Sequence, residues 1–342
     1  MLDKARVWLQ RKHPFVLFHE PNEDSLKAVF QHDSILHKFK GLDDEGFVFA
    51  PFDSNQDSLF TKGTFCEENL ELNGIEESSR KLEFSEKGRE AHIKLVEDAI
   101  EELRSERLQK VVLSRVTEKE TEKSSETVFV SLLKKYQSAF CYWWYHPAIG
   151  MWMGATPEQL LKYNGFEIAL SSLAGTLPYV KGESPNWTPK EIEEQQLVTD
   201  YIKSALQDNV YDLNVSEPVS TMAGKLWHLK SMITGKLNAT RELSSIIKIV
   251  HPTPAVCGLP KEKSFQYIVQ NENHDREFYS GFLGPINLGS TKGASLFVNL
   301  RCLKYREGKA KIYIGGGITA ASNALKEWQE TQLKSRTILA VL

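Results

Sequence analysis

The amino-acid sequence predicts an α+β fold in which the sheet is mainly antiparallel. Strand-like segments follow one another directly, as in residues 140–146 and 150–154, which flank a short turn. Helical patterns occur in residues 86–107, 189–206 and 324–341, so helices do not alternate regularly with strands. Regular alternation would indicate a parallel sheet. A chain of 342 residues can bury a large core, as one large domain or two ordinary ones.

The N-terminal portion has two strand-like runs, residues 14–19 and 46–52. Residues 67–85 are rich in Glu, Ser and Asn, and this polarity predicts a surface excursion between the N-terminal portion and the rest. We therefore expect residues 1–85 to pack on the same domain as a core formed by residues 86–342.

The first helix and the strand after it show clear apolar patterns. Residues 86–107 repeat apolar side chains on one helical face, at Ile93, Val96, Ile100 and Leu103. Residues 110–116 are mostly apolar, which predicts a strand buried on both faces. Lys110 begins this strand, and burial would favour its uncharged amine, which could serve as a general base. A lysine that extends its amine to solvent is the simpler interpretation of these residues alone.

The next two strands lead to a candidate acid. Aromatic side chains at positions 142–145 favour a strand in residues 140–146, and a second strand follows at residues 150–154. Pro157 then stands at a plausible first position of a helix, which would place Glu158 in the first turn. A carboxylate is common there for electrostatic reasons. The alternative is an acid directed into a site.

Three later segments could line a site. A strand at residues 166–170 is followed by residues 173–176, Leu-Ala-Gly-Thr, whose glycine permits close approach of the backbone to a ligand. His228 lies in an apolar strand, where a lone histidine is more often a core residue, although it could bond a substrate hydroxyl. The prolines of residues 251–258 exclude a helix and predict a rigid loop.

The C-terminal segment is the most informative part of the sequence. Residues 294–305 and 309–315 are predicted to form a hairpin, with Arg301 on its first strand, where a guanidinium could bind a carboxylate. Three glycines end the hairpin and would let backbone amides approach a ligand: Gly315, Gly316 and Gly317. Three charged side chains share one face of the final helix: Glu327, Glu330 and Lys334. Carboxylates suit a divalent cation, and lysine and amides suit an anion. A small polycarboxylate gripped partly through a metal is indicated.

A second pair of carboxylates strengthens the metal hypothesis. Glu191 and Glu194, in the predicted helix at residues 189–206, repeat the spacing of Glu327 and Glu330. Two such helices could hold one Mg²⁺ from opposite sides, because this ion takes oxygen ligands in octahedral geometry. Solvated surface carboxylates are the alternative, and the pattern leaves the two interpretations about level.

Composition excludes several classes of partner. With 42 basic and 45 acidic residues, the chain has no excess of positive charge for nucleic acid. Its first residues lack the apolar core of a signal peptide, and no apolar run reaches the roughly 20 residues of a membrane span. The four cysteines are scattered, without a CxxC pair, and we interpret them as reduced thiols. We expect a cytoplasmic protein.

Taken together, these segments resemble the chorismate-utilising enzymes, the group that includes isochorismate, salicylate, anthranilate and aminodeoxychorismate synthases. Ten stretches occur in the family's order between residue 86 and the C-terminus: KVVLSR, GATPEQLL, LAGT, EEQQLVTD, LWHLK, HPTPAVCG, DREFYSG, LRC, GGGI and EWQETQLK. The resemblance implies the chorismate-binding enzyme fold, a single catalytic domain of stacked antiparallel sheets flanked by helices. It also implies a central site for Mg²⁺.

The resemblance further implies a role for each matching residue. Lys110 is similar to the general base that activates water, and Glu158 to the general acid that faces it. Four carboxylates match the metal-binding positions, the first two as direct ligands: Glu194, Glu330, Glu191 and Glu327. The implied ligands of the substrate carboxylates are Arg301, Lys334 and the amides of Gly315, Gly316 and Gly317. The residues implied to line the substrate ring are His228, Ala174, Gly175 and Thr176. Gln195 stands where the family usually has a histidine.

A few positions distinguish the members of the family. Anthranilate synthases typically have Gln where Lys110 stands, and aminodeoxychorismate synthases typically have Lys where Ala174 stands. Lys110 together with Ala174 therefore implies water as the incoming group, and Ala255-Val256 resembles the isochorismate form. The implied activity is Mg²⁺-dependent isomerisation of chorismate to isochorismate, by attack of water at ring C2 and loss of the C4 hydroxyl. Menaquinone biosynthesis is the expected pathway, and siderophore biosynthesis is the alternative.

Two other functions stay open at this point. A salicylate synthase would share Lys110 and Glu158 and would then eliminate pyruvate from isochorismate. A catalytically silent homologue that binds only anions would be expected to have lost one of four residues that this chain retains: Lys110, Glu158, Glu194 and Glu330. Chorismate is the expected small-molecule partner of a monomer. We expect no nucleic-acid or membrane partner and no obligatory amidotransferase subunit.

Overall fold

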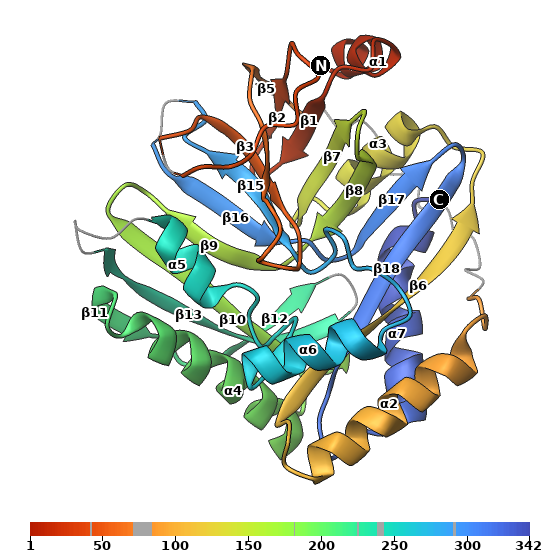
Figure 1. Cartoon of the computed structure of the whole chain (residues 1–342), viewed down its shortest axis with the longest axis vertical. Coiled ribbons are helices and arrows are strands. Elements are labelled where there is room, and N and C mark those ends of the chain that lie inside the picture. The colour runs from red at the N-terminus through yellow and green to blue at the C-terminus, as the bar shows by residue number, and fades with distance from the viewer. Residues whose placement is uncertain (42, 71–83, 181, 224–225, 238–242, 290–291) are drawn as a thin grey trace.

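The computed structural model describes residues 1–41, 43–70, 84–180, 182–223, 226–237, 243–289 and 292–342. Within these residues the strands form two nine-stranded sheets in which neighbouring strands pair antiparallel. The sheets are stacked on each other, and helices cover their outer sides (Figure 1). The predicted α+β class and the mainly antiparallel pairing are therefore confirmed.

The first sheet contains both N-terminal and C-terminal strands. Its members are β1 Phe15–His19, β2 Ser25–Phe30, β5 Thr64–Asn69, β6 Lys110–Glu120, β7 Phe140–His146, β8 Gly150–Thr156, β14 Gly258–Leu259, β17 Cys302–Arg306 and β18 Lys309–Ile318. Their order across the sheet is β14-β6-β18-β17-β8-β7-β1-β2-β5. β18, from the predicted C-terminal hairpin, thus lies beside β6.

The second sheet is formed largely by the middle of the chain. Its members are β3 Gly46–Ala50, β4 Leu59–Thr61, β9 Gln159–Tyr163, β10 Glu167–Pro178, β11 Val210–Val215, β12 Val219–Ala223, β13 Leu226–Leu237, β15 Phe282–Ile286 and β16 Ala294–Val298. Their order is β11-β13-β10-β9-β16-β15-β3-β4, and β12 also pairs with β13.

Seven helices complete the described fold. They are α1 Leu2–Gln10, α2 Arg89–Arg104, α3 Ser125–Lys135, α4 Pro189–Leu206, α5 Leu243–Val250, α6 Lys261–Asn271 and α7 Ala324–Leu339. Figure 1 shows α4 and α5 against the second sheet, and α2 and α7 together at the β6–β18 side of the first sheet. None of the described helices is long and apolar enough to cross a membrane.

An aromatic core holds the two sheets together. Phe140 of β7 stacks on Phe297 of β16, with ring centroids 4.3 Å apart. Phe49 of β3 packs against Trp144 of β7, with ring centroids 4.8 Å apart. Buried aromatic pairs of this kind contribute about 0.5–1.5 kcal/mol each beyond the burial of their area. The aromatic pattern that predicts β7 therefore also supplies the contact between the sheets.

The two helices that carry paired carboxylates have well-defined starts. At α4 the backbone N–H of Thr188 donates to Glu191 Oε2 at 3.0 Å, which completes a capping box. At α7 the Asn323 side chain accepts a hydrogen bond from the backbone N–H of Lys326. α4 packs on β10 and β13, and α7 packs on β18 and α2. Local capping signals thus fix where each carboxylate pair begins.

The predicted helix start at Pro157 is wrong. Pro157 and Glu158 connect β8 to β9, where the chain passes from the first sheet to the second. Thr156 Oγ1 donates to the carbonyl of Val298 at 2.6 Å, and the Val298 N–H donates to the carbonyl of Glu158 at 2.9 Å. Because β16 engages these groups, the segment continues as extended chain and forms no helical turn.

The predicted C-terminal hairpin is correct only in its second half. β17 pairs with β18, but residues 294–305 form two strands, β16 and β17, which belong to different sheets. The chain bends between them at residues 299–301, and Arg301 adopts a left-handed φ of 48°. Arg301 therefore lies in a bend between the sheets and not on a hairpin strand.

The N-terminal portion contributes to both sheets. β1, β2 and β5 join the first sheet, and β3 and β4 join the second. The predicted surface excursion at residues 67–85 is wrong at its start, because residues 67–69 belong to β5. Residues 71–83 lie outside the described part of the chain. The division at residue 85 stays a prediction.

Candidate active site

One cavity is bounded by β6, β10, β13, β18, α4 and α7 and by four connections between elements. All fifteen residues that the sequence suggests for a site line it: Lys110, Glu158, Ala174, Gly175, Thr176, Glu191, Glu194, His228, Arg301, Gly315, Gly316, Gly317, Glu327, Glu330 and Lys334. These residues are far apart in sequence, and only the fold brings them together. The role of each one stays a prediction.

Glycines form one wall of the cavity. A Cβ atom at Gly317 would lie 2.7 Å from Glu194 Oε1 and 3.1 Å from Lys110 Cε, so a side chain there would displace both charged groups. β17 pairs with β18 only as far as Ile312. At Gly315, Gly316 and Gly317, the edge of β18 that faces away from β6 therefore pairs with no strand of the described chain. The missing side chains and this edge make room for a ligand.

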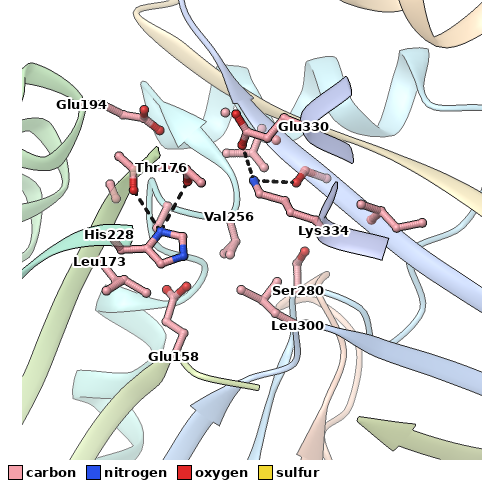
Figure 2. Close-up of a pocket in the computed structure, with 18 of the residues that line it drawn as sticks. Glu158, Leu173, Thr176, Glu194, His228, Val256, Ser280, Leu300, Glu330 and Lys334 are labelled. Atoms are coloured by element: carbon pink, nitrogen blue, oxygen red, sulfur yellow. Dashed lines mark hydrogen bonds and ion pairs between the residues drawn. The ribbon is translucent and has the colours of Figure 1, made fainter. Parts of the chain in front are cut away.

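Glu158 is buried on the far side of the cavity from the glycine wall. It is 6% exposed, and Figure 2 shows it across the cavity from Glu194. Burial raises the pKa of Glu158 to about 7, although nearby positive charges, that of Lys110 foremost, oppose the rise. A carboxyl group with this pKa is protonated in a large fraction of molecules near neutral pH, so it can act as an acid.

Lys110 is buried on the Glu194 side of the cavity. It is 1% exposed, and its Nζ forms an ion pair with Glu194 Oε1 at 2.9 Å. Pairing with Leu259 of β14 and a hydrogen bond from Ser264 Oγ to the Lys110 carbonyl, at 3.0 Å, fix the start of β6. The simpler interpretation, an amine that reaches solvent, is therefore wrong. Lys110 and Glu158 lie on opposite sides of one cavity.

Lys334 and Glu330 form a second ion pair beside the glycines. Lys334 Nζ lies 2.6 Å from Glu330 Oε1 and donates to the carbonyl of Gly315 at 3.1 Å (Figure 2). Burial tends to raise the pKa of Glu330, but the charge and hydrogen bond of Lys334 outweigh it and lower the pKa. Glu330 therefore stays ionised and available to a cation.

Glu327 lies next to this pair, but its negative charge is less well balanced by nearby positive charge than that of Glu330. Burial first, and then the neighbouring charge of Glu330, raise the pKa of Glu327. Glu327 Oε1 accepts a hydrogen bond from Ser322 Oγ at 2.7 Å and lies 3.5 Å from Lys190 Nζ. Lys190 comes from α4, so this contact bridges the two carboxylate-bearing helices. Two adjacent carboxylates that repel each other would gain from a bound cation.

The carboxylates of α4 and α7 suit Mg²⁺, which prefers oxygen ligands. A Cβ atom at Gly316 would lie 3.7 Å from Glu327 Oε2 and 4.0 Å from Glu330 Oε1, so α7 directs both side chains at the glycines that Glu194 also approaches. Glu191 lines the same cavity, but one of its oxygens caps α4. Among the described residues no three acidic, His or Cys side chains are gathered as closely as a metal requires. The chemistry of the oxygen donors suits Mg²⁺, and Glu194 and Glu330, now paired with lysines, would have to turn toward each other to bind it.

His228 presents an uncharged nitrogen to the cavity. Its Nδ1 lies 2.9 Å from the carbonyl oxygen of Gly175 and 3.3 Å from Thr176 Oγ1 (Figure 2). Burial, followed by the charge of Arg301, lowers the pKa of His228 to about 3, so the ring is neutral. Because Nδ1 must carry the proton to bond a carbonyl, Nε2 is an acceptor, and it is buried without a partner in the described chain. A ligand hydroxyl could donate to it.

Several residues that line the cavity were not predicted from the sequence. Lys190 stands in the first turn of α4, so its proximity to the paired carboxylates was available from the sequence. Tyr279, Ser280 and Leu300 lie in connections between elements, and nothing in their local sequence places them in a site. Their positions depend on tertiary structure.

Gln195 points into the protein behind Glu194. It is 2% exposed, and its Nε2 lies 3.1 Å from Ser172 Oγ, 2.9 Å from Thr199 Oγ1 and 3.0 Å from Ser231 Oγ. Ser172 belongs to β10 and Ser231 to β13, so the amide ties α4 to the second sheet. An uncharged group therefore anchors the helix where the resembling enzymes usually have a histidine.

We expect Gln195→Leu to lower the free energy of unfolding by about 1–3 kcal/mol, because a buried hydroxyl loses its partner. Ser172 and Thr199 remain 2.7 Å apart and can bond each other, so Ser231 is the group left unsatisfied. Urea unfolding measures the loss. Gln196→Leu is the matched control on the exposed side of α4, with an expected change within about 0.5 kcal/mol. Equal losses in the two variants would contradict an anchoring role.

The fold and the cavity define a class of protein. In this class two stacked antiparallel sheets enclose a cavity whose walls carry carboxylates, lysines and glycines. This chain belongs to the chorismate binding enzyme family, which matches residues 53–342.

Comparison with individual proteins supports this assignment. The chain is 32% identical over 243 residues to isochorismate synthase EntC of Escherichia coli (strain K12), a match that covers 68% of this chain. The chain spans 62% of the length of that relative. A protein described as a 2,3-dihydroxybenzoate-specific isochorismate synthase, DhbC from Bacillus anthracis, has a similar structure, with a TM-score of 0.82 over 100% of this chain and 99% of that chain at 22% identity. The menaquinone-specific isochorismate synthase MenF of Escherichia coli gives a TM-score of 0.78 over 96% of this chain and 88% of that chain at 21% identity. The predicted chorismate-binding enzyme fold is confirmed.

Proposed function

We propose that this protein is a Mg²⁺-dependent isochorismate synthase, an isomerase of the hydroxymutase type that converts chorismate to isochorismate. One observation carries the proposal: a buried amine, Lys110, and a buried carboxyl group, Glu158, lie on opposite sides of one cavity. The relatives named above are described as isochorismate synthases, which supports the same chemistry.

The proposed reaction is an allylic substitution that needs one base and one acid. Lys110, as the free amine, takes a proton from water while the water oxygen bonds to ring C2. The ring double bonds shift, the C4–O bond breaks, and Glu158 gives its proton to the departing hydroxyl, which leaves as water. One water is consumed and one is released. Exchange with solvent then removes the proton from Lys110 and restores the proton of Glu158.

Other residues of the cavity would bind and orient chorismate, which carries two carboxylates. Arg301 and Lys334 supply positive charge for them. His228 would accept a hydrogen bond from a ring hydroxyl through Nε2, which has no partner in the described chain. The backbone at Ala174, Gly175 and Thr176 would form the wall beside the ring.

The proposal includes Mg²⁺ as the cofactor. Glu194 and Glu330 would be its direct ligands, and Glu191 and Glu327 would support them. When bound, the ion would hold a substrate carboxylate and stabilise the negative charge that develops on the ring.

We expect Glu194→Gln to weaken the binding of Mg²⁺ by about 100-fold or more, because a charged ligand is replaced by a neutral one. Glu193→Gln, the same substitution on the exposed neighbour, should leave the affinity within about twofold. Titration calorimetry of each variant with Mg²⁺, in the presence of chorismate, measures the difference. Equal affinities in the two variants would remove Glu194 from the metal site.

Product analysis tests the proposed function directly. The protein is incubated with chorismate and Mg²⁺, with EDTA in the control, and the products are separated by chromatography. Isochorismate formed only with Mg²⁺ supports the proposal. Salicylate with pyruvate would assign a salicylate synthase, and an aminated product formed only with ammonia would assign a subunit that needs an amidotransferase. Binding of chorismate without turnover would assign a silent homologue.

We further propose that the enzyme acts in menaquinone biosynthesis as a cytoplasmic monomer. The similarity to the menaquinone-specific MenF structure supports this pathway, and the similarity to DhbC keeps siderophore biosynthesis as the alternative. Deletion of the gene followed by feeding separates the two. Growth restored by menaquinone supports the first pathway, and restoration by 2,3-dihydroxybenzoate supports the second.

A further inference from the structure

A buried arginine on β6 has no part in the proposed mechanism. Arg115 follows Lys110 on the same strand, is 6% exposed and is not among the residues that line the cavity. Burial lowers the pKa of Arg115 to about 10, so its guanidinium is still charged at neutral pH. Its Nη1 is buried without a hydrogen-bond partner in the described chain. Because burial of an incompletely paired charge costs free energy, stability alone does not explain this residue.

The guanidinium of Arg115 contacts α7 at three positions. Its Nε donates to Thr331 Oγ1 at 2.8 Å, and its Nη2 donates to Gln332 Oε1 at 3.0 Å. Its Cζ lies 4.2 Å from the centre of the Trp328 ring, in a cation–π contact. Trp328 and Thr331 are both almost fully buried. A planar guanidinium can stack on one side chain while it donates to two others, and an ammonium cannot.

These contacts fix the rotation of α7 about its own axis. Trp328 directly follows Glu327, and Thr331 directly follows Glu330, so each carboxylate adjoins a residue that Arg115 contacts. One residue corresponds to about 100° around a helix. A fixed position of Trp328 and Thr331 therefore also fixes the direction of the two carboxylates, which face the glycines of β18.

The strand that carries Arg115 also carries two other walls of the cavity. β6 begins with Lys110, the proposed base. It pairs with β18, where Ile314 lies opposite Arg115 and Gly317 lies opposite Val112. The base, the glycine wall and, through Arg115, the carboxylates of α7 are thus all placed relative to one strand. Loss of the Arg115 contacts would let α7 turn or slide against that strand.

We propose that Arg115 is a positioning residue that holds the carboxylates of α7 in the arrangement that binds Mg²⁺. It lies outside the cavity and acts through Trp328 and Thr331. The inference rests on the proposed function, which assigns Glu327 and Glu330 to the cation.

Two conservative substitutions test this role. Arg115→Lys keeps the positive charge and removes the planar fork, and Thr331→Val keeps the shape of the side chain and removes the hydroxyl. Each is expected to weaken the binding of Mg²⁺ in the presence of chorismate by about tenfold, as for other groups that orient metal ligands from behind. Titration calorimetry measures this affinity. At saturating Mg²⁺ the kcat should stay within about threefold of the native value, because the loss is in metal binding and not in the chemical step.

Tyr136→Phe is the matched structural control. The Tyr136 hydroxyl donates to the carbonyl of Thr337 at 2.9 Å, so this variant also removes a hydrogen bond to α7, but beyond the carboxylates. It should lower the melting temperature about as much as Thr331→Val does, and it should leave the affinity for Mg²⁺ within about twofold. An equal loss of affinity in Tyr136→Phe would indicate general loosening of the helix and would overturn the proposal.

A double-mutant cycle tests whether Arg115 acts through Thr331. If it does, Thr331→Val should weaken Mg²⁺ binding by less than about twofold in the Arg115→Lys background. Full additivity would overturn this path, and native affinity in both single variants would overturn the positioning role. Should Arg115→Lys fail to fold, Thr331→Val and Tyr136→Phe still decide between the outcomes.

The Glu194→Gln variant separates this inference from the proposed function. If Glu194→Gln weakens Mg²⁺ binding while Arg115→Lys and Thr331→Val do not, only the positioning role fails. If the native protein binds no Mg²⁺ in the presence of chorismate, the proposed function fails, and this inference fails with it.

Discussion

Replacement of Glu158 by glutamine is expected to reduce the turnover of chorismate by about 10³-fold, within the range for loss of a general acid. The substitution keeps the size of the side chain and removes the proton that must leave with the C4 hydroxyl. Binding depends on other residues, so the KM should change by only a few-fold. Steady-state kinetics with Mg²⁺ measure both. A variant that keeps more than about a tenth of native turnover would show that another group supplies the proton.

The pKa of Glu158 also predicts how the activity of the native enzyme depends on pH. Burial raises the pKa of Glu158 to about 7, and the active form is the protonated one. The value of kcat/KM should therefore fall as the pH rises above about 7. The Glu158→Gln variant should lose this alkaline fall and keep only its low activity. A fall of equal size in the variant would assign the titration to a different group.

Glu158 also links stability to pH. Its ordinary pKa of 4.5 applies to the unfolded chain, whereas the folded value is about 7. Between these two pH values the native protein holds a proton that the unfolded chain has released. The contribution of Glu158 to the free energy of unfolding is therefore complete below about pH 4.5 and is lost as the pH rises to 7. The difference amounts to about 3 kcal/mol. The nearly inactive Glu158→Gln variant should therefore unfold at higher denaturant concentration than the native protein at about pH 8, and no such gain is expected at about pH 4.5.

The elements that depend on local patterns were predictable from the sequence. The apolar face of α2 lies within that helix, the capping residues of α4 and α7 stand directly before theirs, and the aromatic run of β7 lies within the strand. The strand at Lys110 was correctly predicted to be buried on both faces, because its apolar run leaves no polar face. Candidate site residues could be selected by chemistry together with the family resemblance, because paired Glu side chains on a helix fit a solvated surface equally well.

The parts that depend on contacts between distant segments were not predictable. Pro157 and Glu158 carry a helix-start signal, but pairing with Val298 overrides it. Arg301 stands in a largely apolar stretch that predicts one strand, and only the separation of β16 and β17 into different sheets makes its position a bend. Tyr279 and Ser280 give no local signal at all, because only the fold brings their connection to the cavity. The errors therefore fall where the two sheets meet, and the cavity lies between them.

The largest loss is expected from Lys110→Ala, because the base that activates water has no substitute in the proposed mechanism. Turnover should fall by about 10³-fold or more. Glu194 loses its partner at 2.9 Å and should bind Mg²⁺ at least as well as before, so calorimetric titration separates loss of the base from loss of the metal. Lys190→Ala is the matched control, since it also removes a cavity lysine that contacts a carboxylate, Glu327 at 3.5 Å, and it should cost less than about tenfold.

Chemical rescue distinguishes a missing base from a damaged fold. The side chain of Lys110 is 1% exposed, so its truncation leaves a space beside the proposed position of the attacking water. A small primary amine such as ethylamine, added to Lys110→Ala, should enter this space and restore part of the turnover in proportion to the free-amine concentration. Lys190→Ala should show no dependence on added amine. Native turnover in Lys110→Ala without added amine would mean that water is activated elsewhere, and the opposed pair of Lys110 and Glu158 would then be the wrong basis for the mechanism.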